Sequence, residues 1–172
     1  MLKLILFIII IGSSSGAGYL ITTPYENRIY QLQELTMTFK VLEAEMKYRK
    51  DPIPVLLYRI GKSNPGKAGD FFLKVHQGLK ETYAFDFYSC WTWAIKEIYE
   101  DSALTEKDRE VISEVGIELG KTDIDNQQSL FARVFSRLEY QVTDAEEEKK
   151  IKGKMYRSIG TAIGILVVIV LL

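Results

Sequence analysis

The chain has 172 residues, with 22 Lys and Arg against 23 Asp and Glu, and 47% of its residues are hydrophobic. The near-zero net charge argues against a nucleic-acid-binding protein, and a single cysteine, Cys90, excludes an internal disulfide framework. With only one histidine, His76, a histidine-based metal site or a Ser-His-Asp triad is hard to build, so we expect no enzyme, no metal and no cofactor.

The N-terminal apolar segment has two interpretations, because residues 4–25 carry no charge. One is a signal peptide, with residues 4–11 as its apolar region and small residues at 15–17 as its cleavage site. The other is a retained transmembrane helix of about 33 Å. Cleavage would place the lysine cluster at 149–157 outside the cell, against the positive-inside rule, so we expect a retained span over residues 1–22.

A long amphipathic helix is predicted from Thr23 to about Lys50. Thr23 is suited to the N-cap, Pro24 to the first helical position, and Glu26 completes a capping box. Asp51-Pro52 disfavours continuation and ends the helix. The predicted apolar stripe is Tyr25, Ile29, Leu32, Leu35, Phe39, Leu42 and Met46.

Three shorter helices follow. The second is predicted at about 52–60 and ends at Gly61, before a loop at 62–67. The third carries Phe71, Phe72, Val75 and Leu79, and the fourth runs from about Thr82 to Glu100. Aromatic residues at helical spacing are typical of a core, so the fourth helix is predicted to point inward with Tyr88, Trp91, Ile95 and Ile98. His76 and Cys90 are expected to pack in the same region.

Two further helices complete the predicted domain. Thr105 caps the fifth, which ends at Gly120, and Asp123 caps the sixth. The fifth helix carries Val111, Ile112, Val115 and Leu119, and the heptad stripe of the sixth is Ile124, Gln128, Phe131, Phe135, Leu138, Val142 and Ala145. No stretch predicts a strand. We therefore expect an all-α protein, with an antiparallel six-helix bundle at 23–154 between two transmembrane helices.

The C-terminal segment 155–172 is the second predicted span, since no residue after Arg157 is charged. Its length of about 27 Å suits a thin bilayer. Both apolar segments have a small-xxx-small pattern, Gly12 with Gly16 and Gly160 with Gly164, that favours close helix packing. Five basic residues stand on the N-terminal side of its uncharged run, which predicts a cell-membrane protein with a cytosolic central domain: Lys149, Lys150, Lys152, Lys154 and Arg157.

The predicted topology brings two turns together at the pole of the bundle far from the membrane, about 40 Å away. They carry the candidate partner-binding residues Arg49, Lys50, Asp51, Lys121 and Asp123, with Gln128 one turn below. In the simpler interpretation Asp51 and Asp123 are N-caps and Gln128 fixes helix register. In the functional interpretation the basic side chains flank a groove that binds a cytosolic partner.

The two turns also carry a family likeness. Leu42-Glu-Ala-Glu-Met-Lys-Tyr48 with Pro52, and Leu119-Gly120 with Asp123 and Gln127-Gln128, resemble the signature of stage III sporulation protein AB. The opening Met1-Leu2-Lys3-Leu4, Trp91 and the Gly160-x-x-x-Gly164 tail fit as well. The sequence departs from the family pattern at Asp51-Pro52-Ile53-Pro54 and in its aromatic middle.

This resemblance implies a mother-cell membrane protein of endospore-forming bacteria, part of a secretion-like channel to the forespore. It also implies a bundle similar to the cytosolic domain of the type II secretion platform protein. The implied partners are the cytosolic ATPase of the complex and its other membrane proteins, with no nucleic acid. The alternative to a non-catalytic platform subunit is a stand-alone membrane adapter whose bundle binds a cytosolic partner.

Overall fold

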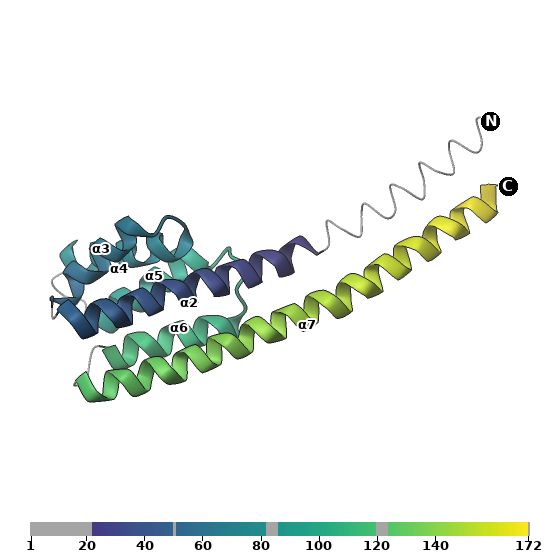
Figure 1. The fold of residues 1–172 in the computed structure, drawn as a ribbon. Coiled ribbons are helices and arrows are strands. Elements are labelled where there is room, and N and C mark those ends of the chain that lie inside the picture. Colours follow the sequence, from purple (N-terminus) through teal and green to yellow (C-terminus); the bar gives the residue numbers. More distant parts are fainter. Residues whose placement is uncertain (1–21, 50, 82–85, 120–123, 172) are drawn as a thin grey trace. The chain divides into compact units, whose positions relative to one another are not determined.

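The described part of the chain is helical. The computed structural model describes residues 22–49, 51–81, 86–119 and 124–171, although not the side chains of residues 124–128, 157, 164, 168, 170 and 171. In these ranges the all-α prediction is confirmed, since they contain six helices and no strand (Figure 1). The helices are α2 (Thr23–Arg49), α3 (Ile53–Ser63), α4 (Lys67–Glu81), α5 (Phe87–Tyr99), α6 (Glu106–Leu119) and α7 (Ile124–Leu171).

The chain divides into two compact units. The larger, residues 28–143, is a helical bundle that contains α3 to α6 entirely, most of α2 and the first part of α7. The other joins the ends of the chain, of which residues 22–27 and 144–171 are described. The candidate partner-binding surface and the core described below belong to the larger unit.

The core of the bundle is aromatic and lies against one stripe of α2. Leu32, Leu35, Phe39 and Leu42 are all buried, which confirms the middle of the predicted stripe. The Phe39 ring stacks with that of Trp91 at 6.3 Å between centroids, and Trp91 meets Phe71 edge-on at 4.9 Å. Such pairs add about 0.5–1.5 kcal/mol each beyond the area that they bury. The buried Trp91 Nε1–H donates to the carbonyl of Ile112 at 2.9 Å, so its polar atom is satisfied.

Gly61 does not end α3, as the sequence predicted; it lies inside the helix. A Cβ at Gly61 would come within 2.7 Å of Leu73 Cγ, and one at Gly69 within 1.8 Å of the carbonyl oxygen of Asn64. Glycine is needed here for a close approach between α3 and α4. The expected loop therefore shrinks to the residues around Gly66, which has a φ of 121°.

The fourth predicted helix, α5, begins later than expected. Asp86 is its N-cap, and the Asp86 carboxylate accepts from the Ser89 amide at 2.7 Å, so the described helix starts at Phe87. This start sets the buried face at Cys90, Trp91, Ala94, Ile95 and Tyr99. The predictions for Trp91, Ile95 and Cys90 are confirmed, but Tyr88 is exposed and Ile98 and His76 are only half-buried.

The start of α6 follows the sequence closely. Thr105 and Asp108 form a reciprocal capping box: the Asp108 amide donates to Thr105 Oγ1 at 3.3 Å, and the Thr105 amide donates to Asp108 Oδ2 at 2.8 Å. All four residues predicted for the core of this helix are buried, namely Val111, Ile112, Val115 and Leu119.

The buried face of α7 is wider than the predicted heptad. Phe131, Leu138 and Ala145 are buried as expected, whereas Phe135 and Val142 are only half-buried. Three residues missing from the predicted stripe are buried in their place: Leu130, Val134 and Gln141. A two-stranded seam needs only a narrow stripe, but this part of α7 contacts α2 on one side and α6 on the other.

The predicted C-terminal span is the last part of α7, because this helix runs on without a break through residue 155. The predicted N-terminal span lies outside the described residues, apart from Thr22. Within the part of the chain that the structure describes, no helix has the length and apolar content needed to cross a membrane.

Candidate docking surface

The candidate surface lies where α2 ends and α3 begins. Arg49 and Asp51, two of the predicted partner-binding residues, belong to one ion-pair network there. Arg49 Nε lies 3.2 Å from Glu45 Oε2, and Glu45 also pairs with Arg59 of α3. Arg59 Nη2 lies 3.1 Å from Asp51 Oδ2, so Glu45 and Arg59 connect the two predicted residues.

Asp51 is not the N-cap of α3, as the simpler interpretation expected. Pro52 occupies the cap position, and no side chain there accepts a hydrogen bond. The Asp51 carboxylate accepts from both terminal nitrogens of Arg59 at 3.1 Å instead. Although partial desolvation opposes it, the hydrogen bonds that Arg59 donates to Asp51 and Glu45 raise the pKa of Arg59 above its ordinary value. The carboxylates of Asp51 and Glu45 therefore fix the α2–α3 turn by holding a cation between them.

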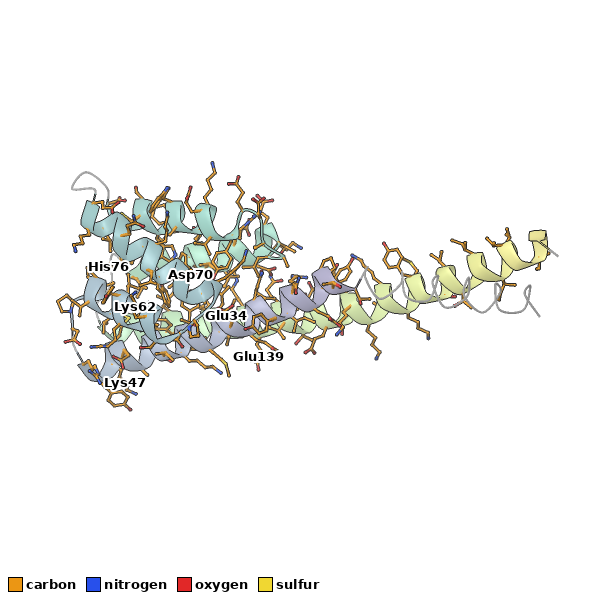
Figure 2. The ribbon with its side chains drawn as sticks, turned by 90° about the horizontal axis from the view of Figure 1, so that it is seen from above. Glu34, Lys47, Lys62, Asp70, His76 and Glu139 are labelled. Atoms are coloured by element: carbon orange, nitrogen blue, oxygen red, sulfur yellow. The ribbon has the colours of Figure 1, made fainter. Side chains whose placement is uncertain are left out.

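Aromatic and basic side chains surround this network. Tyr58 is exposed on α3, with the Lys62 ammonium 6.0 Å from its ring centre and the His76 ring 5.0 Å away. His76 Nδ1 lies 2.9 Å from the carbonyl oxygen of Pro54. Lys47, at the end of α2, lies over the ring of the exposed Tyr48. Figure 2 shows Lys47, Lys62 and His76 at the same end of the bundle, which makes this end basic and aromatic.

The other predicted partner-binding residues stay untested. Lys50, Lys121 and Asp123 lie outside the described residues, and Gln128 belongs to α7 but its side chain is not described. Whether the second turn meets the first therefore remains a prediction.

The predicted basic residues before the C-terminal segment lie along α7. Lys149 Nζ is 2.9 Å from Glu26 Oε1, and Lys152 lies over the Tyr25 ring and 3.2 Å from Glu148 Oε1. The hydrogen bond to Glu148, followed by that to Tyr25, raises the pKa of Lys152. Lys150 and Lys154 are exposed, whereas the side chain of Arg157 is not described.

The four glycines predicted for transmembrane packing divide between two regions. Gly12 and Gly16 lie outside the described residues, and Gly160 and Gly164 belong to α7. At Gly153, which belongs to neither pattern, an added Cβ would lie 3.2 Å from the methyl carbon of Thr22. The packing of the four predicted glycines stays a prediction.

Sequence reasoning missed a buried polar network in the bundle. Arg28 of α2 donates from Nε to Asp108 Oδ2 at 2.8 Å and from Nη2 to Asp108 Oδ1 at 3.0 Å. Arg28 Nη2 also donates to Gln141 Oε1 at 3.0 Å. Exposure of the three residues is 4%, 0% and 8%, so this is a desolvated, bidentate pair that joins α2, α6 and α7.

A signal for Arg28 was present in the sequence. Counting back from Phe39, the steps of four to Leu35 and three to Leu32 continue with a step of four to Arg28. The network is internal and fixes how three helices meet. It offers no group to a ligand, so the basic, aromatic end remains the candidate site.

Comparison with known proteins agrees with this architecture. The family model described as stage III sporulation protein AB matches residues 3–172. A relative in Bacillus subtilis (strain 168), named stage III sporulation protein AB, is 25% identical over 172 residues, which cover 100% of each chain. A solved structure of the same name is similar in fold, with a TM-score of 0.65 and 24% identity over 72% of this chain and 96% of that chain.

The resemblance read from the two turns and the apolar tail is thereby confirmed. The match is consistent with a role in sporulation, and the family's description names a developmental stage and no chemical reaction. Because the family model spans almost every residue, from 3 to 172, the chain belongs to the stage III sporulation protein AB family.

Proposed function

We propose that this protein is a non-catalytic, membrane-anchored assembly subunit of a secretion-like channel between mother cell and forespore. Its bundle is the platform part, similar to the cytosolic domain of the type II secretion platform protein. The observation that carries the proposal is the pairing of a sporulation-family helical bundle with an end of α7 that is first basic and then uncharged and mostly aliphatic.

The apolar end of α7 supports the anchoring. Five large aliphatic side chains there are exposed: Ile159, Ile163, Ile165, Leu166 and Ile169. Exposed aliphatic residues in such number call for an apolar environment. The basic residues between 149 and 157 come directly before them, and the positive-inside rule then places the bundle in the cytosol. Residues 1–22 form the second anchor in this proposal.

A fusion experiment tests the anchoring. The protein should fractionate with membranes, and alkaline phosphatase fused at Ser63 should be inactive because that position faces the cytosol. The same enzyme fused after Leu172 should be active and serves as the matched control. Phosphatase activity from the Ser63 fusion would reverse the proposed orientation, and recovery of the chain in the soluble fraction would contradict the anchoring.

The basic, aromatic end of the bundle is the proposed docking site for the cytosolic ATPase of the complex. Arg49, Lys50 and Lys121 supply positive charge, and Tyr58 supplies exposed apolar area. Tyrosine and arginine are the residues that interface centres favour. A partner surface with carboxylates beside an apolar side chain would complement this end.

Charge reversal tests the docking site. The triple variant Arg49→Glu, Lys50→Glu, Lys121→Glu should keep its thermal stability, since solvated charges contribute at most about 1 kcal/mol each. It should nonetheless fail to co-purify the ATPase from membranes and fail to support sporulation. The matched control reverses three exposed lysines elsewhere on the bundle, Lys80, Lys96 and Lys107, and should behave as wild type. Normal spore yield from the triple-glutamate variant at normal protein level would reject the site. If the wild-type protein co-purifies with no other channel component, the stand-alone adapter is favoured.

A further inference from the structure

A straight, uncharged stripe of α2 faces solvent. It consists of Tyr30, Gln33, Met37, Val41, Ala44 and Tyr48, all of them exposed. Their spacings of 3, 4, 4, 3 and 4 cover about five turns at 3.6 residues per turn, so the six positions form one line along the helix. Tyr30, Met37 and Tyr48 are 66%, 71% and 78% exposed. This stripe is a second face of α2, distinct from the one that builds the core, and an apolar face of this size indicates an interaction surface.

A groove runs beside the stripe, between α2 and α7. It has a volume of about 280 Å³ and is lined by Gln33, Thr36, Met37, Lys40, Phe135, Glu139 and Val142. The half-buried Phe135 contributes an aromatic surface, with the Lys40 ammonium 5.8 Å from its ring centre. The groove would accept side chains such as Met37 from a second helix laid along α2.

The rims of the groove carry opposite charges. Lys40 stands on α2, and Glu139, labelled in Figure 2, stands on α7. Neither side chain has an ion-pair partner among the residues that the structure describes. A purely acidic or purely basic partner helix would bring a like charge to one of the two rims.

We propose that a second copy of this chain covers the stripe and the groove in a twofold contact. In an isologous interface the same patch serves both subunits, so Lys40 meets Glu139 of the partner subunit, and the reverse pair forms as well. The Met37 side chains lie near the axis and enter the facing grooves. A partner helix of one sign is repelled at one of the two rims. A copy of the same surface instead brings the opposite charge to each rim.

The two subunits lie parallel, with α2 beside α2, along about 27 Å of helix. The parallel direction rests on the membrane anchoring proposed above, which holds both copies in one plane, whereas the contact itself rests only on the stripe and the groove. Anchoring also raises the local concentration, so a modest interface is sufficient.

Cysteine cross-linking of the full chain in membranes tests the contact. Met37→Cys should form a disulfide-linked dimer under mild oxidation, because residues near a twofold axis bring their own Cα atoms within bonding range. The native Cys90 is buried, and burial, with the Asp86 charge, raises the pKa of its thiol, so its background should be low. The matched control is Ala132→Cys, an exposed position on α7 outside the groove, which should cross-link at least about tenfold less.

Charge exchange tests the pairing. Lys40→Glu or Glu139→Lys alone should weaken dimerisation of the detergent-solubilised full chain about tenfold or more, and the double variant should restore it. Light scattering over a concentration series gives the affinity, and an unchanged melting temperature shows that the bundle is intact. Any of three results would overturn the proposal. The chain could stay monomeric at every concentration, residues 37 and 132 could cross-link equally, or the double variant could dimerise no more tightly than the single variants. Membrane fractionation measures the anchoring independently of dimerisation, so failure of the dimer and failure of the anchoring are distinguishable.

Discussion

The two seams that flank α7 in the bundle are built in opposite ways. At the seam with α6, Arg133 and Arg137 of α7 pair with Glu114, and Arg133 also pairs with Glu118. At the seam with α2, the side chains of Met37 and Phe135 line a groove whose charged residues, Lys40 and Glu139, make no ion pair with any residue that the structure describes. At the α6–α7 seam the charges already neutralise each other, so they gain little from a partner. At the open α2–α7 seam the apolar area is still exposed, and a partner can bury it.

The seams share one interior point, where Arg28, Asp108 and Gln141 bring α2, α6 and α7 together. The difference between the seams is therefore confined to their outer edges. Stability should depend on the shared interior, and recognition on the α2–α7 edge.

The largest expected effect comes from breaking the shared interior. Asp108→Ala should destabilise the protein by about 3–5 kcal/mol, because it leaves the Arg28 guanidinium buried without its carboxylate. Chemical denaturation of the full chain measures the loss. Glu114→Ala, at the α6–α7 edge, is the matched control and should cost at most about 1 kcal/mol. Similar losses for the two variants would show that the interior pair is not what holds the three helices.

Two phenylalanines of α7 separate interior from edge. Phe131→Ala should cost about 3–5 kcal/mol because this side chain is buried, whereas Phe135→Ala should cost about 1–2 kcal/mol. The predicted heptad stripe contains both phenylalanines, so the heptad alone gives no reason for a smaller loss at Phe135. Denaturation midpoints of the two variants at equal protein concentration provide the comparison, and an equal loss would mean that Phe135 is as well packed as Phe131.

The ion pairs of the α6–α7 edge should contribute little. Replacing Arg133 or Arg137 with Gln should each cost at most about 1 kcal/mol, because both side chains are close to half exposed. The loss should shrink further in high salt, where exposed charges are screened. Melting curves at low and high salt measure this, and a loss that salt does not reduce would point to packing by the arginine stems instead.

The smallest effect is expected at Tyr99, away from both seams. Its buried hydroxyl has no hydrogen-bond partner among the described residues, so Tyr99→Phe should change stability at neutral pH by less than about 1 kcal/mol. Burial, followed by the charges of Glu34 and Asp70, raises the pKa of Tyr99 well above the ordinary tyrosine value of about 10.

The sign of the pH dependence follows from that shift. Above about pH 10 the unfolded chain releases the Tyr99 proton and the folded chain keeps it, so stability is complete below this pH and declines as pH rises. Tyr99→Phe should remove this part of the alkaline loss. Stability curves for wild type and variant that remain parallel through the alkaline range would show that the hydroxyl titrates normally.

The helices were predictable from the sequence because their signals are local. The cap at Thr105, which the structure completes with Asp108, and the apolar spacing of Leu32, Leu35, Phe39 and Leu42 were both predicted, and the structure confirms them. Helix ends were less predictable, since the glycine at 61 serves packing between α3 and α4 rather than termination. The sequence alone does not distinguish a glycine that ends a helix from one that allows two helices to pack closely.

The candidate site was predictable only in part. Arg49 and Asp51 are close in sequence, so their presence in one ion-pair network could be expected. The role of Arg59 could not, because it depends on α3 folding back beside α2. Arg28 and Gln141 were missed because charged and amide side chains are usually exposed, and their burial becomes favourable only once Asp108 is in place. Pairing across such sequence distances is a tertiary property that no window of the sequence contains.

The Arg28 network has a consequence for synthesis. Asp108 is synthesised 80 residues after Arg28, and Gln141 is synthesised 113 residues after it. At about 5–20 residues per second, the last partner is made about 6–23 s after Arg28. During that interval the core stripe of α2 has no α7 to cover it, and a charged side chain lies where the interior will be. The nascent chain should therefore complete its bundle only near the end of translation, and a ribosome stalled before residue 141 should carry a protease-sensitive α2.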